Sequence, residues 1–555
     1  MTKAQLLSML ICLLSLACTP DRREREPADG GNNETGGNDS GNENGVSNIC
    51  HPKSTFCDQK IIRKCDASGQ SSTAVESCKE ECSFGRCITT RCKTAQETNT
   101  TDGCLFYGLD TDNAFHDDTQ VFGFPIGNPG TAPVWVDVEK SVSEDTWLPV
   151  VSGFVYAGTI NYFRIALGPK MGDDYHIEGT GQGYKAYRIT STGPIVAYQI
   201  NADDEAVGSI NSGSTLLLPM HVLGQHYYAI TPPDQGAASF SHATFGPDHG
   251  FISVVGAKNN TKVTITVKGA VMTGGPIGAM AAGETSSFII NEGEVVQLET
   301  QGKGDDFSGS EIISDQPVVV YAGSVCGSFD PMRIAYRACD HIVETMYPTR
   351  SWGKNFVFLD MRMPEHLPSK SIWGRIVASE NDTTVNFDSP RTLPGLPSAT
   401  ILKRGEVLAL EITDSLASGG RAHFSILADK PIEVGAFIGD DEGGAIIAPT
   451  DQFLDDYLIS THPWFTGYIM ITRKVGTPVT LNGLPVPDSV FAPGGNGYEV
   501  SYIPTKRCEG LLNECAHRVV GSNIGVAVTA NGGSCNYCYV GGTAVKCVNK
   551  FTGCK

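Results

Sequence analysis

The residues most able to do chemistry in this sequence are its 18 cysteines. Cysteines form disulfides in exported proteins and act as metal ligands or nucleophiles in many others. Sixteen of them fall into three groups of even size, with eight in 50–104, two at 326 and 339, and six in 508–554. Even clusters predict disulfides. The predicted disulfide cysteines are Cys50, Cys57, Cys65, Cys78, Cys82, Cys87, Cys92, Cys104, Cys326, Cys339, Cys508, Cys515, Cys535, Cys538, Cys547 and Cys554.

The first cysteine group lies in a stretch with little apolar content, which a hydrophobic core alone cannot hold together. We predict a cysteine-rich disulfide module at 49–92, with a knot over 50–87 and with Cys92 and Cys104 bridging its exit; the connectivity stays open. In the last group, the spacing of Cys535 and Cys538 also occurs in zinc sites and redox motifs. No second such pair and no histidine at ligand spacing accompanies it, so disulfides are favoured there too.

The two remaining cysteines lie at the N-terminus. Lys3 and the apolar run 6–14 have the form of a signal peptide and are too short to span a bilayer. Ser15-Leu16-Ala17-Cys18 resembles a bacterial lipobox, although Ser15 stands where leucine is usual. We predict a signal peptide at 1–18 with Cys18 as the lipidated residue. The alternative is an ordinary secretory signal, and with either the chain leaves the cytoplasm.

Residues 19–48 are almost wholly polar and predict a disordered tether, because such a segment buries too little apolar surface to offset its ordering entropy. Its reach as a random coil is roughly 30 Å. We therefore expect a surface-exposed, lipid-anchored protein of the bacterial cell envelope. In a Gram-negative cell, Thr19 in place of aspartate favours the outer membrane. The net charge of −20 argues against a nucleic-acid partner.

Catalytic motifs are lacking in usable contexts, so we predict no catalytic residue, no cofactor and no enzyme. Asp340-His341 could suggest a general base, but neighbouring residues of a strand point to opposite faces, which favours a structural role. Acidic clusters lie at 110–113, 203–205, 440–442 and 455–456. None completes a calcium-loop pattern, so we predict solvated loops and no metal site.

The segment between Cys326 and Cys339 is the candidate binding loop. A disulfide around a loop lowers the ordering cost of binding, and aromatic and arginine side chains are frequent at interface hot spots. The candidate contact residues are Phe329, Met332, Arg333, Tyr336 and Arg337. The alternative is that the loop only covers a sheet edge.

The elements that must position these residues are strands of a repeated pattern. Turn residues precede an alternating strand at 260–265, 382–387 and 476–481, and more loosely at 128–134. Alternation of period two predicts half-buried strands. A second element begins at Gly293 and recurs 112 positions on, as the copies "GEVVQL" and "GEVLAL" show.

A third element starts with proline at the permitted first position of a strand, as at Pro194, Pro317 and Pro431. A fourth runs Pro-x4-Gly-x2-aromatic from Pro219 and again from Pro348. The pattern predicts an all-β region at 93–555 with copies at about 104–240, 241–365, 366–470 and 471–555. We favour tandem β-sandwich-like units, and a propeller-like closed arrangement is the alternative.

The stretch 314–358 carries a family resemblance. It reads SDQPVVVYAG, then Cys326, then Ala338-Cys339-Asp340-His341, then Trp352-Gly353-Lys354. It resembles the IgG Fc-binding protein N-terminal domain family, as do the LLLP segment at 216–219 and the entry at 103–107. The resemblance implies extracellular binding or adhesion, and it extends over most of 104–555. It assigns no ligand residue and does not imply that this chain binds immunoglobulin.

The combined interpretation is a cell-surface lipoprotein that binds an extracellular protein or glycoprotein and is held at the membrane by its N-terminal lipid. Two alternatives stay open. A secreted hydrolase on a β scaffold would need paired carboxylates in a cleft. A structural protein of the envelope would be distinguished only by its partner.

Overall fold

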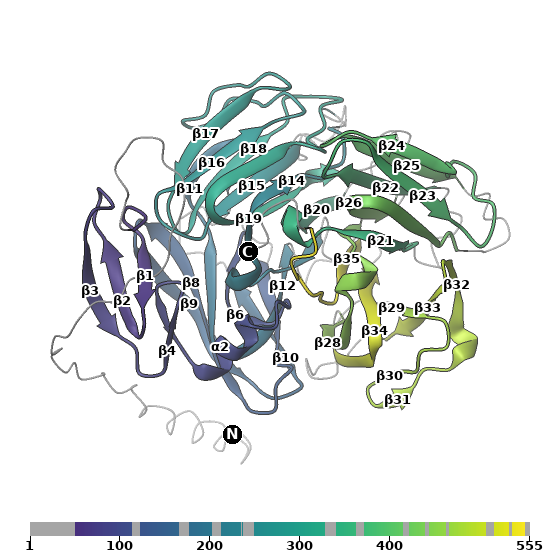
Figure 1. The fold of residues 1–555 in the computed structure, drawn as a ribbon, viewed down its shortest axis with the longest axis horizontal. Helices are drawn as coiled ribbons and strands as arrows, with labels where there is room; N and C mark the ends of the chain where they lie inside the picture. The colour runs from purple at the N-terminus through teal and green to yellow at the C-terminus, as the bar shows by residue number, and fades with distance from the viewer. Residues whose placement is uncertain are drawn as a thin grey trace, which may run out of the picture. The chain divides into compact units, whose positions relative to one another are not determined.

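The protein was analysed as a computed structural model, which describes residues 50–113, 122–165, 177–201, 212–234, 236, 249–327, 340–361, 371–413, 421–438, 443–461, 466–506, 515–531 and 536–549. Strands dominate these residues (Figure 1). An all-β fold with a disulfide-rich N-terminal stretch is therefore confirmed. Within the described ranges, we find no helix of the length and apolar character needed to cross a membrane.

The cysteine-rich module has two small sheets and one short helix. Its elements are β1 (Thr55–Asp58), β2 (Ile61–Cys65), β3 (Ser72–Ser77), β4 (Glu81–Ser83), β5 (Arg86–Ile88) and α2 (Thr90–Gln96). Disulfides join Cys50 to Cys65, Cys57 to Cys82, Cys78 to Cys87 and Cys92 to Cys104. Its small core consists of Ile62 and half-cystines, so covalent links replace the apolar core that the sequence lacks.

Four repeats follow the module. The first holds β6 (Gly103–Gly108), β7 (Phe122–Gly127), β8 (Val134–Ser143), β9 (Thr146–Val155), β10 (Ile160–Ile165), β12 (Tyr187–Asn201) and β13 (Gly213–Leu216). The second holds β14 (Gly224–Tyr228), β15 (Gly250–Gly256), β16 (Thr261–Thr266), β17 (Thr285–Ile290), β18 (Glu294–Glu299), β19 (Glu311–Gly327) and β20 (Asp340–Thr345). Strand β11 (Gly181–Tyr184) leaves the first repeat and pairs with β18 of the second.

The third repeat holds β21 (Gly353–Phe358), β22 (Ser371–Ala378), β23 (Thr383–Asp388), β24 (Ala399–Leu402), β25 (Val407–Thr413), β26 (Phe424–Ile438) and β27 (Gly444–Ile446). The fourth holds β28 (Leu454–Ser460), β29 (Thr466–Lys474), β30 (Val479–Leu481), β31 (Leu484–Pro485), η7 (Asp488–Val490), β32 (Phe491–Gly495), β33 (Tyr498–Thr505), β34 (Ala516–Asn531) and β35 (Asn536–Val540). All strand pairs in these repeats are antiparallel, and the strand order recurs from one repeat to the next.

Each repeat is organised by one long strand of 15 to 17 residues, namely β12, β19, β26 or β34. The first half of β12 pairs with β6 and β8, and its second half pairs with β7 and β13. Two short sheets therefore share one strand, and apolar side chains from both pack in one core. The alternating burial of β16 confirms the period-two pattern predicted at 260–265, whereas most of the looser segment 128–134 precedes β8 as a loop. The repeats are thus sandwich-like.

The repeat boundaries given by the strand order lie nearer the N-terminus than those that the sequence pattern predicted. The Pro-x4-Gly element does not end a copy: it is a 3-10 turn followed by the first strand of the next repeat, at η1 (Met220–Val222) and η3 (Thr349–Ser351). A similar turn without the glycine, η6 (Thr450–Gln452), follows Pro449 and precedes β28. The expected division at 470/471 consequently cuts through β29. The turn packs back on its own repeat, because a Cβ added at Gly103 would lie 2.4 Å from the Pro219 side chain, and Gly224 meets Pro348 in the same way.

The repeats form a closed cycle of contacts. The last strands β13, β20, β27 and β35 touch one another in turn. After β35 the chain returns to the entry of the first repeat, where Thr101 N donates to Thr543 O at 3.0 Å and Val545 N to Asn99 O at 2.7 Å. Tyr198 of the first repeat donates to Gly541 O at 2.6 Å. The described residues therefore combine the two expected arrangements. The units are sandwich-like, and the contact between the fourth repeat and the first closes them into a cycle, as in a propeller-like arrangement.

Candidate binding site

The predicted binding loop lies outside the described residues, and with it Phe329, Met332, Arg333, Tyr336, Arg337 and Cys339. Cys326, at the start of that loop, is buried and disulfide-bonded. Cys515 and Cys547 are also disulfide-bonded, whereas Cys508, Cys535 and Cys554 lie outside the described residues. Cys538 is buried on β35.

His341 lies in the core and is 1% exposed. Its Nε2 lies 2.8 Å from Thr111 Oγ1, and its ring stacks on Phe251. Burial lowers the pKa of His341 to about 4, so the imidazole is neutral at pH 7. This surrounding is that of a packed side chain.

The acidic cluster at 110–113 was wrongly interpreted as a solvated loop. Asp112 is buried and accepts a hydrogen bond from Gly179 N at 2.7 Å. Burial and the neighbouring Asp112 together raise the pKa of Glu299 well above its usual range. Asp455 and Asp456 do lie exposed, the clusters at 203–205 and 440–442 fall outside the described residues, and no described group of three or more ligands could hold a metal ion.

A cavity of about 220 Å³ lies where the cysteine-rich module meets the first two repeats. The module contributes Phe84 and Arg86, the first repeat contributes Tyr107 and Arg188, and the second repeat contributes Glu292. Junctions between domains are frequent ligand sites. We therefore take this cavity as the candidate binding site among the described residues.

Glu292 is the centre of the polar network in this cavity. Its Oε1 accepts from Tyr107 Oη at 2.8 Å and from Arg188 Nη1 at 3.3 Å, and it also pairs with Arg86. Burial lowers the pKa of Arg86, but Glu292, Tyr107 and Glu139 together raise it more, so the net shift is upward and the guanidinium stays charged. Burial, with the Glu292 charge beside it, raises the pKa of Tyr107, which keeps its hydroxyl as a donor.

Arg188 is held in place on three sides. It donates to Glu139 Oε2 from Nε at 3.0 Å and from Nη2 at 2.7 Å, and its guanidinium lies 4.1 Å from the centre of the Trp147 ring. Strand register places it, since Arg188 on β12 lies directly opposite Tyr107 on β6. The arginine is therefore fixed before any ligand arrives, which reduces the ordering cost of binding.

The turn that carries Glu292 depends on the glycine that follows it. Gly293 has a φ of +79°, and a Cβ there would lie 2.6 Å from both Ser141 and Trp147. Ser141 Oγ donates to Gly293 O at 2.7 Å. Glycine is favoured at this position because the backbone is left-handed and a neighbouring repeat leaves no room for a Cβ. The close approach of the Gly293 turn to the first repeat places Glu292 beside the residues of that repeat.

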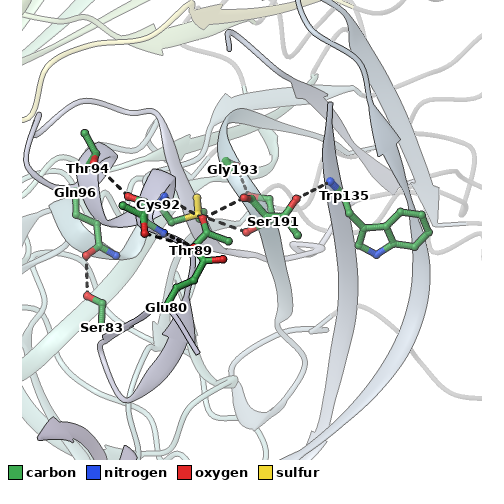
Figure 2. The surroundings of a disulfide bond; sticks show 12 residues. Glu80, Ser83, Thr89, Cys92, Thr94, Gln96, Trp135, Ser191 and Gly193 are labelled. Carbon is green, nitrogen blue, oxygen red and sulfur yellow. Dashed lines mark hydrogen bonds between the residues drawn. A yellow bond between two sulfur atoms is a disulfide. The ribbon is translucent and has the colours of Figure 1, made fainter. Parts of the chain in front are cut away.

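Helix α2 and a disulfide fasten the module to the first repeat, and with it Arg86. Figure 2 shows Thr89 capping the helix, where its Oγ1 accepts from Cys92 N at 3.2 Å and donates to Thr192 O at 3.1 Å. Cys92, bonded to Cys104, lies against Ser191. Glu80 accepts from Thr90 N at the start of the helix. The predicted bridge at the exit of the module is confirmed.

Two further lining residues, Asn259 and Asp145, pair with each other. Asn259 Nδ2 donates to Asp145 Oδ1 at 2.8 Å, and Lys64 Nζ pairs with Asp145 at 2.6 Å. Asn259 Oδ1 also accepts from Glu292 N at 2.9 Å, which links this pair to Glu292. Sequence reasoning missed this site because Arg86 and Glu292 are 206 positions apart. The turn before "GEVVQL" was the only local signal.

Comparison with known proteins places the chain in a family. The family model described as IgGFc binding protein matches residues 213–532, which is more than half of the chain. The human IgGFc-binding protein is 29% identical over 143 residues, which make up 26% of this chain and 2% of the human protein. No solved structure matches. On the strength of the match over 213–532, which runs from β13 through the end of β34, this chain belongs to the IgGFc binding protein family.

Proposed function

We propose that this chain is a bacterial cell-surface lipoprotein that binds an extracellular protein or glycoprotein. The observation that carries the proposal is the family match over the second, third and fourth repeats. Immunoglobulin Fc is the first partner to test, because it is in the name of the family and of the human relative. The lipobox-like Ser15–Cys18 and the polar stretch 19–48 support the anchor.

The outer edges of the repeats support binding rather than catalysis. Strands β9, β17 and β24 are edge strands, and each exposes an apolar side chain at the equivalent register position. Phe154 is 51%, Ile289 52% and Ile401 67% exposed, opposite Trp135, Lys262 and Thr384 respectively. An edge strand offers unpaired backbone groups to an extended segment of a partner, and its side chains add specificity.

The test is capture of immobilised Fc, mucin glycoprotein and cell-surface extract by the full oxidised chain. We expect saturable capture of at least one bait, lost on reduction. The variant F154S/I289S/I401S should weaken capture at least tenfold while its melting temperature is unchanged. Matched substitution of exposed Val475 and Val490 should leave capture unaltered. Failure of the folded chain to capture any bait would contradict the proposal.

The anchor needs its own measurement. Radiolabelled palmitate supplied to cells should label the wild-type chain and not Cys18→Ser, and protease added to intact cells should release residues 48–555 from the surface. Labelling that persists in Cys18→Ser would show that Cys18 is not the lipid site.

A further inference from the structure

The 220 Å³ cavity has the size of one substituted ring. A protein cavity of about 150 Å³ holds a benzene molecule, so this one admits a six-membered ring that carries several substituents. Two thirds of its lining belongs to the module and the first repeat, which precede the matched residues 213–532. Its ligand is therefore not given by the family match.

The cavity wall has an apolar part. It is formed by Phe84 of the module, Leu105 and Trp147 of the first repeat, Met220 of the turn η1, and Ala257 of the second repeat. Such a surface suits the C–H groups of a ring, and amphipathic ligands bury one apolar face while their polar edges are hydrogen-bonded.

The rest of the wall presents hydrogen-bond donors and acceptors side by side. Arg86 and Lys258 are donors, Glu292 and Asp145 are acceptors, and Asn259 is both. A hydroxyl group donates one hydrogen bond and accepts others, so a ring with several hydroxyls can satisfy both kinds of group at once. A purely apolar ring would displace water from these groups without replacing the hydrogen bonds of that water, which lowers affinity.

Four charged side chains of the wall, Arg86, Arg188, Glu292 and Asp145, already have partners of opposite charge. Arg86 and Arg188 both pair with Glu292, Arg188 also pairs with Glu139, and Asp145 pairs with Lys64. An anionic ligand would have to approach the Glu292 and Asp145 carboxylates, and a cationic one would meet two guanidinium groups. A neutral ligand avoids both penalties.

From this combination we infer that the cavity binds one neutral sugar residue, presented as the end of a glycan. The inference rests on the proposed function in one respect: the glycan belongs to the extracellular glycoprotein partner. Glu292 and Lys258 hydrogen-bond the hydroxyls of the sugar, and Trp147 and Phe84 contact the ring. The fixed module keeps the cavity formed in the absence of ligand.

The test titrates the full oxidised chain with galactose, glucose, mannose, fucose and N-acetylglucosamine, followed by calorimetry and thermal shift. Glucuronic acid and N-acetylneuraminic acid are the anionic comparisons. We expect saturable binding of at least one neutral sugar, with acids at least tenfold weaker. A glycan array then distinguishes a free sugar from a sugar at the end of a glycan. The glycan terminus should bind more tightly than the free sugar.

Two variants report on the cavity and one serves as the control. Glu292→Gln and Lys258→Ala should each weaken sugar binding about tenfold. Arg404→Gln occupies the equivalent position at the next repeat junction, outside the cavity, and should leave sugar binding unchanged. Lys258→Ala leaves Arg86, Arg188 and Glu292 in place, so it tests the cavity even if Glu292→Gln perturbs the fold.

The outcomes separate this inference from the proposed function. Capture of a glycoprotein that neither free sugar nor Lys258→Ala diminishes would retain the proposed function and overturn the sugar site. Absence of saturable binding by every neutral sugar to the folded chain would overturn it too. Sugar binding without capture of any protein bait would retain the site and overturn the proposed function.

Discussion

Two junctions between repeats use the same positions with opposite charges. At the first, Tyr107 and Arg188 lie opposite each other on β6 and β12 and contact Glu292 from the turn of the second repeat. At the second, Tyr228 and Glu311 lie opposite each other on β14 and β19. They contact Arg404 from the corresponding turn of the third repeat.

The turns themselves are alike. Glu292 precedes Gly293, Arg404 precedes Gly405, and both glycines have a positive φ. The backbone thus fixes where the three side chains meet, and the choice of charge is free. The exchanged charges prevent one repeat from docking at the wrong junction. A turn that carried Glu292 would place its carboxylate beside the Glu311 carboxylate at the second junction, and the two would repel each other. The comparison teaches that geometry comes from the repeat, whereas the charge pair identifies the partner surface.

The junctions differ in burial and in attached parts. The Arg188 side chain is 10% exposed, whereas Arg404 is 50% exposed. The cysteine-rich module extends the first junction, to which it adds Arg86 and the cavity. Loss of charge pairing should therefore cost more at the first junction than at the second.

The largest effect is expected from Glu292→Arg. It places a third guanidinium beside Arg86 and Arg188 in a mostly buried network, and disruption of buried pairs costs about 3–5 kcal/mol. Calorimetric unfolding should show a strongly lowered melting temperature, with Glu292→Gln intermediate. An unchanged melting temperature would mean that the junction does not depend on this charge.

Removal of the link between module and first repeat should come next. The double substitution Cys92→Ser and Cys104→Ser opens a loop of sequence separation 12, and a loop of that size contributes about 3 kcal/mol. Limited proteolysis should then cut near α2 while the repeats stay intact. Cys78→Ser and Cys87→Ser, within the module, is the matched control and should leave that segment protected.

A smaller effect is expected at the second junction. Arg404→Glu opposes Glu311, but the site is half exposed, so the loss should be about 1 kcal/mol. Combining it with Glu311→Arg should restore most of the stability in a double-mutant cycle. Lack of recovery would show that the two side chains are not coupled.

The smallest effect is a pH dependence confined to the second junction. A hydrogen bond from His226, with further ones from Tyr228 and Arg404, lowers the pKa of Glu311 from 4.5 to about 2. The stabilisation is therefore present above pH 4.5 and lost as pH falls towards 2. The melting-temperature difference between wild type and Glu311→Gln should shrink over that range, and a constant difference would contradict this account.

Local pattern predicted much of the fold. Period-two alternation identified strands such as β16 and β23, and the even cysteine clusters identified the stapled module, because both depend on neighbours in sequence. The cavity was beyond such reasoning. Glu292, Arg188 and Arg86 come from three units, and no rule of spacing relates a turn residue to positions 104 and 206 residues earlier.

The sequence by itself determined the strand-forming pattern, the repetition and the cysteine groups, since each is a property of short segments. Tertiary structure decided where one repeat ends, because Pro219 packs back over Gly103 of its own repeat. It also decided that the fourth repeat meets the first, through the pairing of residues 99–101 with 543–545. Those contacts join distant segments, and only the packing of whole repeats can select them.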